Sequence, residues 1–307
     1  MNQVEFMEGF EELLEEQGFR GRIISIEHVE ELQQEIDALH RKNLLDEELY
    51  DTYLASFDFE CRQKLPNARS LIIVSVPQPQ VRVTFMRKDQ SSPVIIPPTY
   101  AFSSDDHVAD LLRAYLEPMR YGLQKVRLPQ KLLAVRSGLA RYGKNNITYV
   151  SGMGSFHRPV LFISDCPSRP GTWREPAPLD QCEKCSACVK ACPSHAIAQD
   201  RFLLHAERCI TFYNERTSPF PDWLSPSWHR CLVGCMVCQK ACPANRDVMG
   251  WIREGPAFDN DETALLLEGA TEDDLPARTL DTLRGLDMME YLPVIGRNLK
   301  AVLKKSA

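Results

Sequence analysis

Two cysteine runs constrain this chain more than any other feature. The first, CEKCSACVKACPSHAI, places Cys182, Cys185, Cys188 and Cys192 in a CxxCxxCxxxCP spacing. Three cysteines separated by two residues can wrap around one face of an iron–sulfur cubane, and the fourth of such a run normally ligates the other cluster of a pair. Zinc also binds CxxC pairs, but a run that ends in Cys-Pro favours iron and sulfide over zinc and over disulfides.

The second run, CLVGCMVCQKACP, has a different spacing, because its last three cysteines follow CxxCxxxCP. The crossover of the fourth cysteine predicts two ligand sets. They are a first set of Cys182, Cys185, Cys188 and Cys242 and an incomplete second set of Cys192, Cys235 and Cys238.

Two cysteines can supply the missing ligand of the second set. Cys231 lies four residues before Cys235 and would crowd the cubane from one side, whereas Cys209 in LLHAERCITFYNE comes from a separate segment. Geometry favours Cys209 only slightly, so both stay open at this point. We expect the remaining cysteines, Cys61 and Cys166, to be small buried hydrophobic residues.

Composition predicts a cytoplasmic globular protein. The chain has 307 residues, of which 44% are hydrophobic, enough for a compact body with appended modules. Its first residues, MNQVEFMEGFEELLEEQG, lack the charged and apolar regions of a signal peptide. No apolar run approaches the ~18 residues of a membrane span, and clustered cysteines inside cells usually bind metal.

Charge is unevenly distributed along the chain. Residues 1–60 carry 17 acidic and 4 basic side chains, whereas residues 113–144 carry 8 basic ones and only Glu117 as an acid. The basic segment is either a solvated helix face or the rim of a site for an anionic ligand, such as a phosphate-bearing cofactor or RNA. Charge alone does not choose between them.

Periodicity predicts an α/β body, a cysteine module and a helical tail. The proline-rich segment CPSRPGTWREPAPLD marks a boundary near residue 175. We expect domains at 1–175, 176–250 and 251–307. Helical patterns of the body fall near residues 6–18, 28–42, 46–57, 105–120 and 129–137, and strand patterns near 22–26, 68–77, 81–96, 146–150 and 159–165.

Two clusters can pass single electrons but do little chemistry unaided, so the α/β body should hold an electron acceptor or its cofactor. No GxGxxG motif opens a helix after a strand, and no GxxxxGK[ST] is present. Neither a dinucleotide-binding Rossmann unit nor a P-loop is therefore predicted.

Several stretches resemble one family, the cobalamin-dependent epoxyqueuosine reductases, which are related to reductive dehalogenases. The resemblance covers about residues 65–250. It is carried by LPNARSLIIVSVP, by KLLAVRSGLARYGKNNITYVSGMGSFHRPVLFISD, by LLHAERCITFYNE, by the two cysteine runs and by CPANRDV.

The resemblance implies a nitroreductase-like α/β domain, base-off cobalamin and a ferredoxin-like double [4Fe-4S] domain. It implies that Cys209 completes the second ligand set and that Cys231 is spare. It also implies an external electron donor of the ferredoxin or flavodoxin type and a tRNA or other anionic substrate. The residues that it places around the corrin are Tyr142, Gly143, Lys144, Asn145, Gly154, Ser155 and Phe156.

Two departures separate the chain from that family. The family carries an acidic proton donor about fourteen positions before the glycine of its Gly-Leu motif, where this chain has Gln124 before Gly138. Opening a C–O bond needs a proton source, and His157 and Tyr142 are the weaker candidates that remain. The family's helical-repeat extension is also missing, and residues 255–307 carry 10 acidic against 6 basic side chains, unlike an RNA-binding face.

The sequence is consistent with three functions. The first is a cytoplasmic reductase that uses cob(I)alamin recharged through two clusters. The second is a non-catalytic electron-transfer or corrinoid-reducing partner protein, which the missing acid and the short tail favour. The third is a ferredoxin-like carrier whose α/β body is structural and binds no cofactor.

Overall fold

The computed structural model of the protein describes residues 2–88, 90–168 and 173–304. It divides into two compact units. The first contains Met1–Pro77 and Phe102–Cys185, and the second contains Gln78–Ala101 and Ser186–Ala307. Residues 78–101 thus join the cysteine region instead of the body predicted at 1–175, and part of the predicted connector, 169–172, lies outside the described residues.

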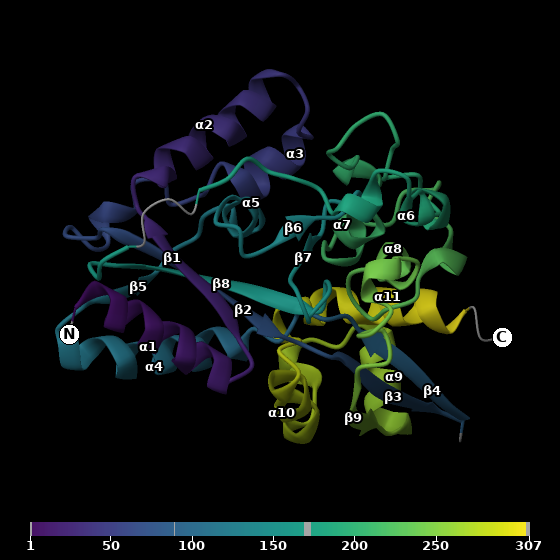
Figure 1. Ribbon diagram of the computed structural model, residues 1–307. Coiled ribbons are helices and arrows are strands. Elements are labelled where there is room, and N and C mark those ends of the chain that lie inside the picture. The colour runs from purple at the N-terminus through teal and green to yellow at the C-terminus, as the bar shows by residue number, and fades with distance from the viewer. Residues whose placement is uncertain (1, 89, 169–172, 305–307) are drawn as a thin grey trace. The chain divides into compact units, whose positions relative to one another are not determined.

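The first unit is built on a four-stranded antiparallel sheet of order β1-β2-β8-β5. Helices α1 and α4 cover one face of this sheet, and α2 and α5 cover the other (Figure 1). The elements are α1 (Gln3–Glu16), β1 (Arg20–Ser25), α2 (His28–Arg41), α3 (Glu47–Leu49), β2 (Ser70–Pro77), α4 (Ser103–Leu116), β5 (Leu123–Lys125), α5 (Gln130–Arg136), β6 (Arg141–Tyr142), β7 (Thr148–Tyr149) and β8 (His157–Ser164).

Strand β2 supplies both cores of the first unit. Leu71 and Ile73 pack with the α2 and α5 side chains, whereas Ile72 and Val74 pack with those of α1 and α4, and all four are fully buried. A strand covered on both faces reads as a continuous apolar run. This explains the run SLIIVSV and confirms the predicted α/β layer structure.

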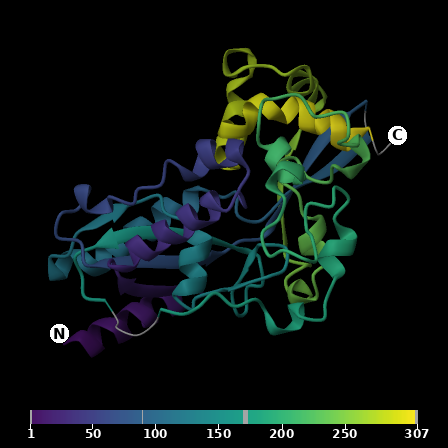
Figure 2. The same cartoon turned by 90° about the horizontal axis from the view of Figure 1, so that it is seen from above.

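The second unit contains a three-stranded sheet of order β4-β3-β9, short helices around the cysteines and a helical C-terminal part. Figure 2 shows the C-terminal helix α11 in yellow, beside the green segments of the cysteine region. The elements are β3 (Gln80–Arg87), β4 (Gln90–Ile96), α6 (Ala187–Ala191), α7 (Ile210–Asn214), α8 (Val237–Lys240), β9 (Ile252–Phe258), α9 (Asn260–Glu268), α10 (Ala277–Gly285) and α11 (Leu292–Leu303).

Strand β9 begins the part that the sequence predicted to be entirely helical. It runs IREGPAF and pairs in parallel with β3, with a register shift between Arg82 and Thr84. Gly255 and Pro256 are unusual in a strand, but an edge strand tolerates a proline that cannot donate a hydrogen bond. Among the described residues, no helix combines the length and apolarity needed to cross a membrane.

A buried ion pair fastens α4 to the sheet of the first unit. The Asp105 carboxylate is 4% exposed and accepts hydrogen bonds from Arg158 Nε at 2.6 Å and Nη2 at 2.9 Å. Lys125 Nζ lies 2.8 Å from the same carboxylate, and the Arg158 guanidinium lies 4.4 Å from the centre of the Phe102 ring. Burial raises the pKa of Asp105, but the bonds from Arg158 and Lys125 outweigh it, so the net pKa is lowered.

We predict that Asp105→Asn lowers the free energy of unfolding by ~3 kcal/mol near neutral pH, because Arg158 loses its buried partner. A lowered carboxylate pKa stabilises the fold above the unfolded pKa, and this contribution is lost as pH falls through the lower folded value. The gap between wild type and variant should therefore close below about pH 4. Urea midpoints measured from pH 7 to pH 3 test this.

The matched control is Asp110→Asn, whose pair with Arg113 is exposed. It should change stability by less than about 0.5 kcal/mol. Equal effects of the two variants would contradict the role given to Asp105.

Candidate functional site

The second predicted ligand set is assembled from three segments of the second unit. Cys192 immediately follows α6, and Cys209 immediately precedes α7. Cys235 lies two residues before α8, and Cys238 lies within it. Their thiols are electrostatic neighbours, because Cys192 raises the pKa of Cys209, while Cys238 and Cys209 both raise that of Cys235. The fold thus brings Cys209 beside cysteines that are 17 and 26 residues away in the sequence.

These thiols are costly to ionise without a cation beside them. Burial is the largest cause that raises the pKa of Cys209, and it raises that of Cys235 well above the ordinary value. A thiolate is the form that ligates iron, so a cationic iron core would supply the missing compensation. The donor set therefore fits a [4Fe-4S] cluster in number and chemistry.

Cys231 has a different environment. It is completely buried, its backbone pairs with Ile95 of β4, and Leu232 N donates to Ile95 O at 2.9 Å. Burial raises the pKa of the Cys231 thiol to about 11, and it also neighbours Cys235. The surrounding Leu232 and Val233 are fully buried as well, so Cys231 lies within an apolar core segment.

The two cysteine runs form similar local structures. Helices α6 and α8 pack against each other, and each is followed by a Cys-Pro pair, Cys192-Pro193 and Cys242-Pro243. Of the first predicted set, Cys182 and Cys185 belong to the first unit, and Cys188 and Cys242 to the second. Their joint ligation of one cluster stays a prediction.

No three cysteine, histidine or acidic side chains among the described residues converge as they would on a single metal ion. Four thiolates around a cubane stand farther apart than four around one ion, because each binds a different iron atom. All eleven cysteines are free thiols.

The loop predicted to border a corrin is a tight turn between β6 and β7. Gly143 N donates to Ile147 O at 2.8 Å, and Asn145 Nδ2 donates to Tyr149 Oη at 2.9 Å. A Cβ on Gly143 would overlap both the Asn145 amide oxygen and the Tyr149 ring, so glycine is required there.

Most of the seven predicted corrin neighbours are buried inside the first unit. Tyr142, Asn145, Ser155 and Phe156 are 7% exposed or less, and Gly143 is buried too. The two that keep a partly exposed surface are Lys144 and Gly154. The loop can therefore offer a corrin little besides the Lys144 side chain and the Gly154 backbone.

Lys144 is instead bonded to the first cysteine run. Its Nζ donates to the backbone oxygen of Cys185 at 2.9 Å. The neighbouring Arg141 pairs with Asp180 at 2.5 Å, and this bond raises the pKa of Arg141. The nearby Cys182 raises that pKa further. Two cations of the basic segment thus stand beside cysteines, which sequence reasoning did not anticipate.

The two candidate proton donors are buried. His157 is 2% exposed, and its Nε2 lies 3.1 Å from Thr148 O. Burial lowers its pKa to about 4, so the ring is neutral at neutral pH and holds no extra proton to give. Burial raises the pKa of Tyr142 far above its ordinary value. Gln124 lies exposed on β5, where the resembling family has its acid.

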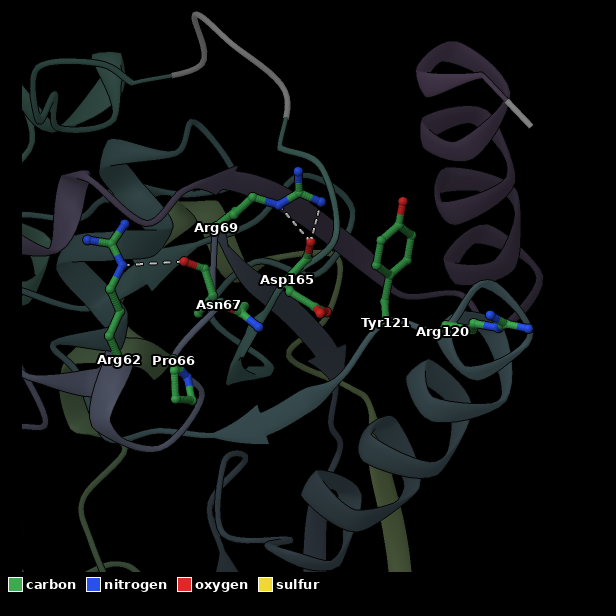
Figure 3. Close-up of a pocket in the computed structure, with 8 residues that line it drawn as sticks. Arg62, Pro66, Asn67, Arg69, Arg120, Tyr121 and Asp165 are labelled. Atoms are coloured by element: carbon green, nitrogen blue, oxygen red, sulfur yellow. Dashed lines mark hydrogen bonds between the residues drawn. The ribbon is translucent and has the colours of Figure 1, made fainter.

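A hollow of about 500 Å³ lies at the opposite end of β8, next to Asp165. Its three arginines do not converge, since the Arg120 side chain points away from Arg62 and Arg69 (Figure 3). Arg69 donates to the backbone oxygen of Asp165 at 2.9 and 2.6 Å, and Arg62 pairs with Glu27 at 2.5 Å. The Arg69 bonds join the segments next to the inner strands β2 and β8, and the arginines do not build an anion site.

Sequence reasoning also missed a buried contact near the second set. The Tyr100 hydroxyl donates to the Glu215 carboxylate, and burial raises the pKa of Tyr100 far above its ordinary value. The two residues are 115 positions apart, so no local motif could reveal them.

Comparison with known proteins agrees with this arrangement. Residues 181–245 match the family described as 4Fe-4S double cluster binding domain. An epoxyqueuosine reductase of Cyclobacterium marinum is 30% identical over 159 residues, which cover 48% of this chain and 50% of that protein. The chain thus spans about half the length of curated relatives that it matches.

Solved structures share the fold. The epoxyqueuosine reductase of Streptococcus thermophilus has a TM-score of 0.67 at 17% identity, over 100% of this chain and 82% of that one. An epoxyqueuosine reductase crystallised with a modified tRNA-Tyr stem loop has a TM-score of 0.62 at 20% identity, over 98% and 82% of the two chains. The predicted double [4Fe-4S] domain and the epoxyqueuosine reductase-like fold are therefore confirmed.

We predict that His157→Gln flattens the pH dependence of stability between about pH 6.5 and pH 4. The folded ring stays neutral in this window while the unfolded one takes up a proton, so wild-type stability falls as pH falls. Glutamine keeps a donor toward Thr148 but does not titrate. Urea midpoints at pH 7 and pH 5 measure the slope, and His107→Gln, at an exposed position, should leave it unchanged.

Proposed function

We propose that this epoxyqueuosine reductase-like chain is an iron–sulfur oxidoreductase, in which two [4Fe-4S] clusters pass single electrons to an acceptor held by the α/β unit. The match of residues 181–245 to a double cluster domain carries this proposal. The first unit, far larger than an electron carrier needs, supports it as the place for the acceptor.

The proposed ligands form two sets with crossed membership. Bound clusters supply one-electron storage and transfer. The protein's own part is to hold thiolates, to bury them and to place cations beside them, as Lys144 and Arg141 do for the first run. The proposed sets are Cys182, Cys185, Cys188 and Cys242 for the first cluster and Cys192, Cys209, Cys235 and Cys238 for the second.

The acceptor that we propose is cobalamin, and the support for it is sequence resemblance. The buried loop at 142–145 limits how that cofactor could be contacted, and Lys144 and Gly154 are the accessible candidates. The proposed donor is a ferredoxin or flavodoxin, and the proposed location is the cytoplasm. Epoxyqueuosine in tRNA is the proposed substrate, because a relative of this fold was crystallised with such a stem loop.

A second candidate function is an electron-transfer or corrinoid-reducing partner protein without a substrate of its own. Gln124 favours it, because that position offers no proton to an opening epoxide. The burial of His157 and Tyr142 adds to this, since neither side chain is placed as a proton donor at the surface.

We predict that Cys209→Ser loses about half of the iron of the reconstituted protein, because one of two clusters loses a ligand. Cys231→Ser is the matched control and should keep nearly all of it, since its thiol is a buried core group. Iron and sulfide per chain, with EPR of the reduced protein, measure both. The opposite pattern would transfer the ligand role to Cys231.

We predict that the anaerobically reconstituted protein binds hydroxocobalamin and shows a base-off cobalt EPR signal after reduction. Reduction of an epoxyqueuosine-containing anticodon stem loop then separates the two functions. Turnover supports the reductase, whereas cobalamin reduction without turnover supports the partner protein. A protein that binds no cobalamin contradicts both roles for that cofactor.

A further inference from the structure

The C-terminal helix α11 is hydrogen-bonded to two of the three segments that carry the second ligand set, those of Cys209 and Cys235. Asn298 is completely buried, and its Nδ2 donates to Asn214 O at 2.7 Å and to Leu232 O at 2.9 Å. Asn214 ends the short helix that starts after Cys209. Leu232 lies three residues before Cys235, so one amide joins the two ligand-bearing segments.

Asn214 extends this connection to the residue beside Cys235. Its Nδ2 donates to Gly234 O at 2.8 Å, and the side chain is completely buried. Its Oδ1 has no hydrogen-bond partner among the described residues. A buried amide with an unpaired oxygen is unfavourable by itself. The favourable contribution of the Asn214 side chain is therefore its donated bond to Gly234.

Arg297 determines which way the Asn298 amide faces. The guanidinium donates to Asn298 Oδ1 from Nε at 3.3 Å and from Nη2 at 3.1 Å. It also donates from Nη2 to Tyr213 O at 2.7 Å and lies 4.0 Å from the centre of the Phe220 ring. With its oxygen held by Arg297, the amide must turn its NH2 group toward Asn214 and Leu232.

Gly234 is restrained on its other side by Tyr100. Its backbone has φ of +61°, and a Cβ there would overlap the Tyr100 hydroxyl. Tyr100 is in turn held by its bond to Glu215, next to Asn214 in the sequence. The residue before Cys235 therefore lies against Tyr100 at its α-carbon and is hydrogen-bonded by Asn214 at its carbonyl.

We propose that Arg297, Asn298 and Asn214 form a positioning relay that sets the distance between Cys209 and Cys235 for the second cluster. This inference rests on the proposed ligand roles of these two cysteines. The two segments are separated by a long loop, and a cluster requires ligands held at fixed places. Arg297 and Asn298 supply that restraint from α11, a helix that carries no ligand.

The test is Asn298→Leu, which keeps a similar shape and removes both donated bonds. We expect loss of about half the iron, loss of the second cluster's EPR signal, and retention of the first cluster's signal with unchanged far-UV circular dichroism. Lys300→Ala, on the exposed side of the same helix, is the matched control and should keep all of the iron.

Asn298→Asp tests the donors alone, because a carboxylate keeps the contact with Arg297 but cannot donate. It should lose the second cluster as Asn298→Leu does. Full iron content with an unchanged EPR signal in both variants would overturn the relay. Loss of both clusters, or a collapsed circular dichroism spectrum, would overturn it too, because it would show a general structural role.

Cys209→Ser, measured in the same series, separates this inference from the proposed function. If Cys209→Ser keeps all of its iron, the ligand assignment fails. If it loses half of the iron while both Asn298 variants remain fully loaded, the ligand assignment stands and the relay fails.

Discussion

The cost of ionising buried thiols governs how the second unit is built. Cys209, Cys235 and Cys231 all have pKa values raised by burial, and in the first two the neighbouring thiols add to it. Thiolates that repel one another in an apolar setting come together only around a cation. Hydrogen bonds of the surrounding chain hold such groups close, and they come from α7, from the β4 contact of Leu232 and from the Asn298 side chain of α11.

Patterns of residues near one another in the sequence predicted many of the helices and strands. The apolar stripe of α1 and the apolar run of β2 predicted a helix and a strand, because both depend on residues near in sequence. Strand β9 was not predicted because Gly255 and Pro256 are atypical of strands, and its pairing partner β3 is far away in the sequence. The placement of the β3–β4 hairpin in the second unit was missed for the same reason, since that partner lies beyond the cysteine region.

The residues of the candidate site also divide into those predicted from local sequence and those that depend on the folded chain. Cysteine spacing predicted the double cluster domain, because a CxxC segment encodes its own ligand geometry. The proton donor could not be found by spacing, since burial decides whether His157 holds a proton, and burial is a property of the folded chain. Asn298 and Asn214 are 84 residues apart and belong to no motif, so their amides became visible only through their contacts.

The parallel pairing of β3 with β9 has a consequence for how the protein reaches its loaded state. Arg82 and Glu254, which face each other across these strands, are 172 residues apart. A contact of such high sequence separation forms slowly, because closing the long intervening loop costs entropy before any pairing repays it. The sheet of the second unit can therefore be completed only after β9 has been synthesised, when every cysteine of both proposed ligand sets is already in the chain.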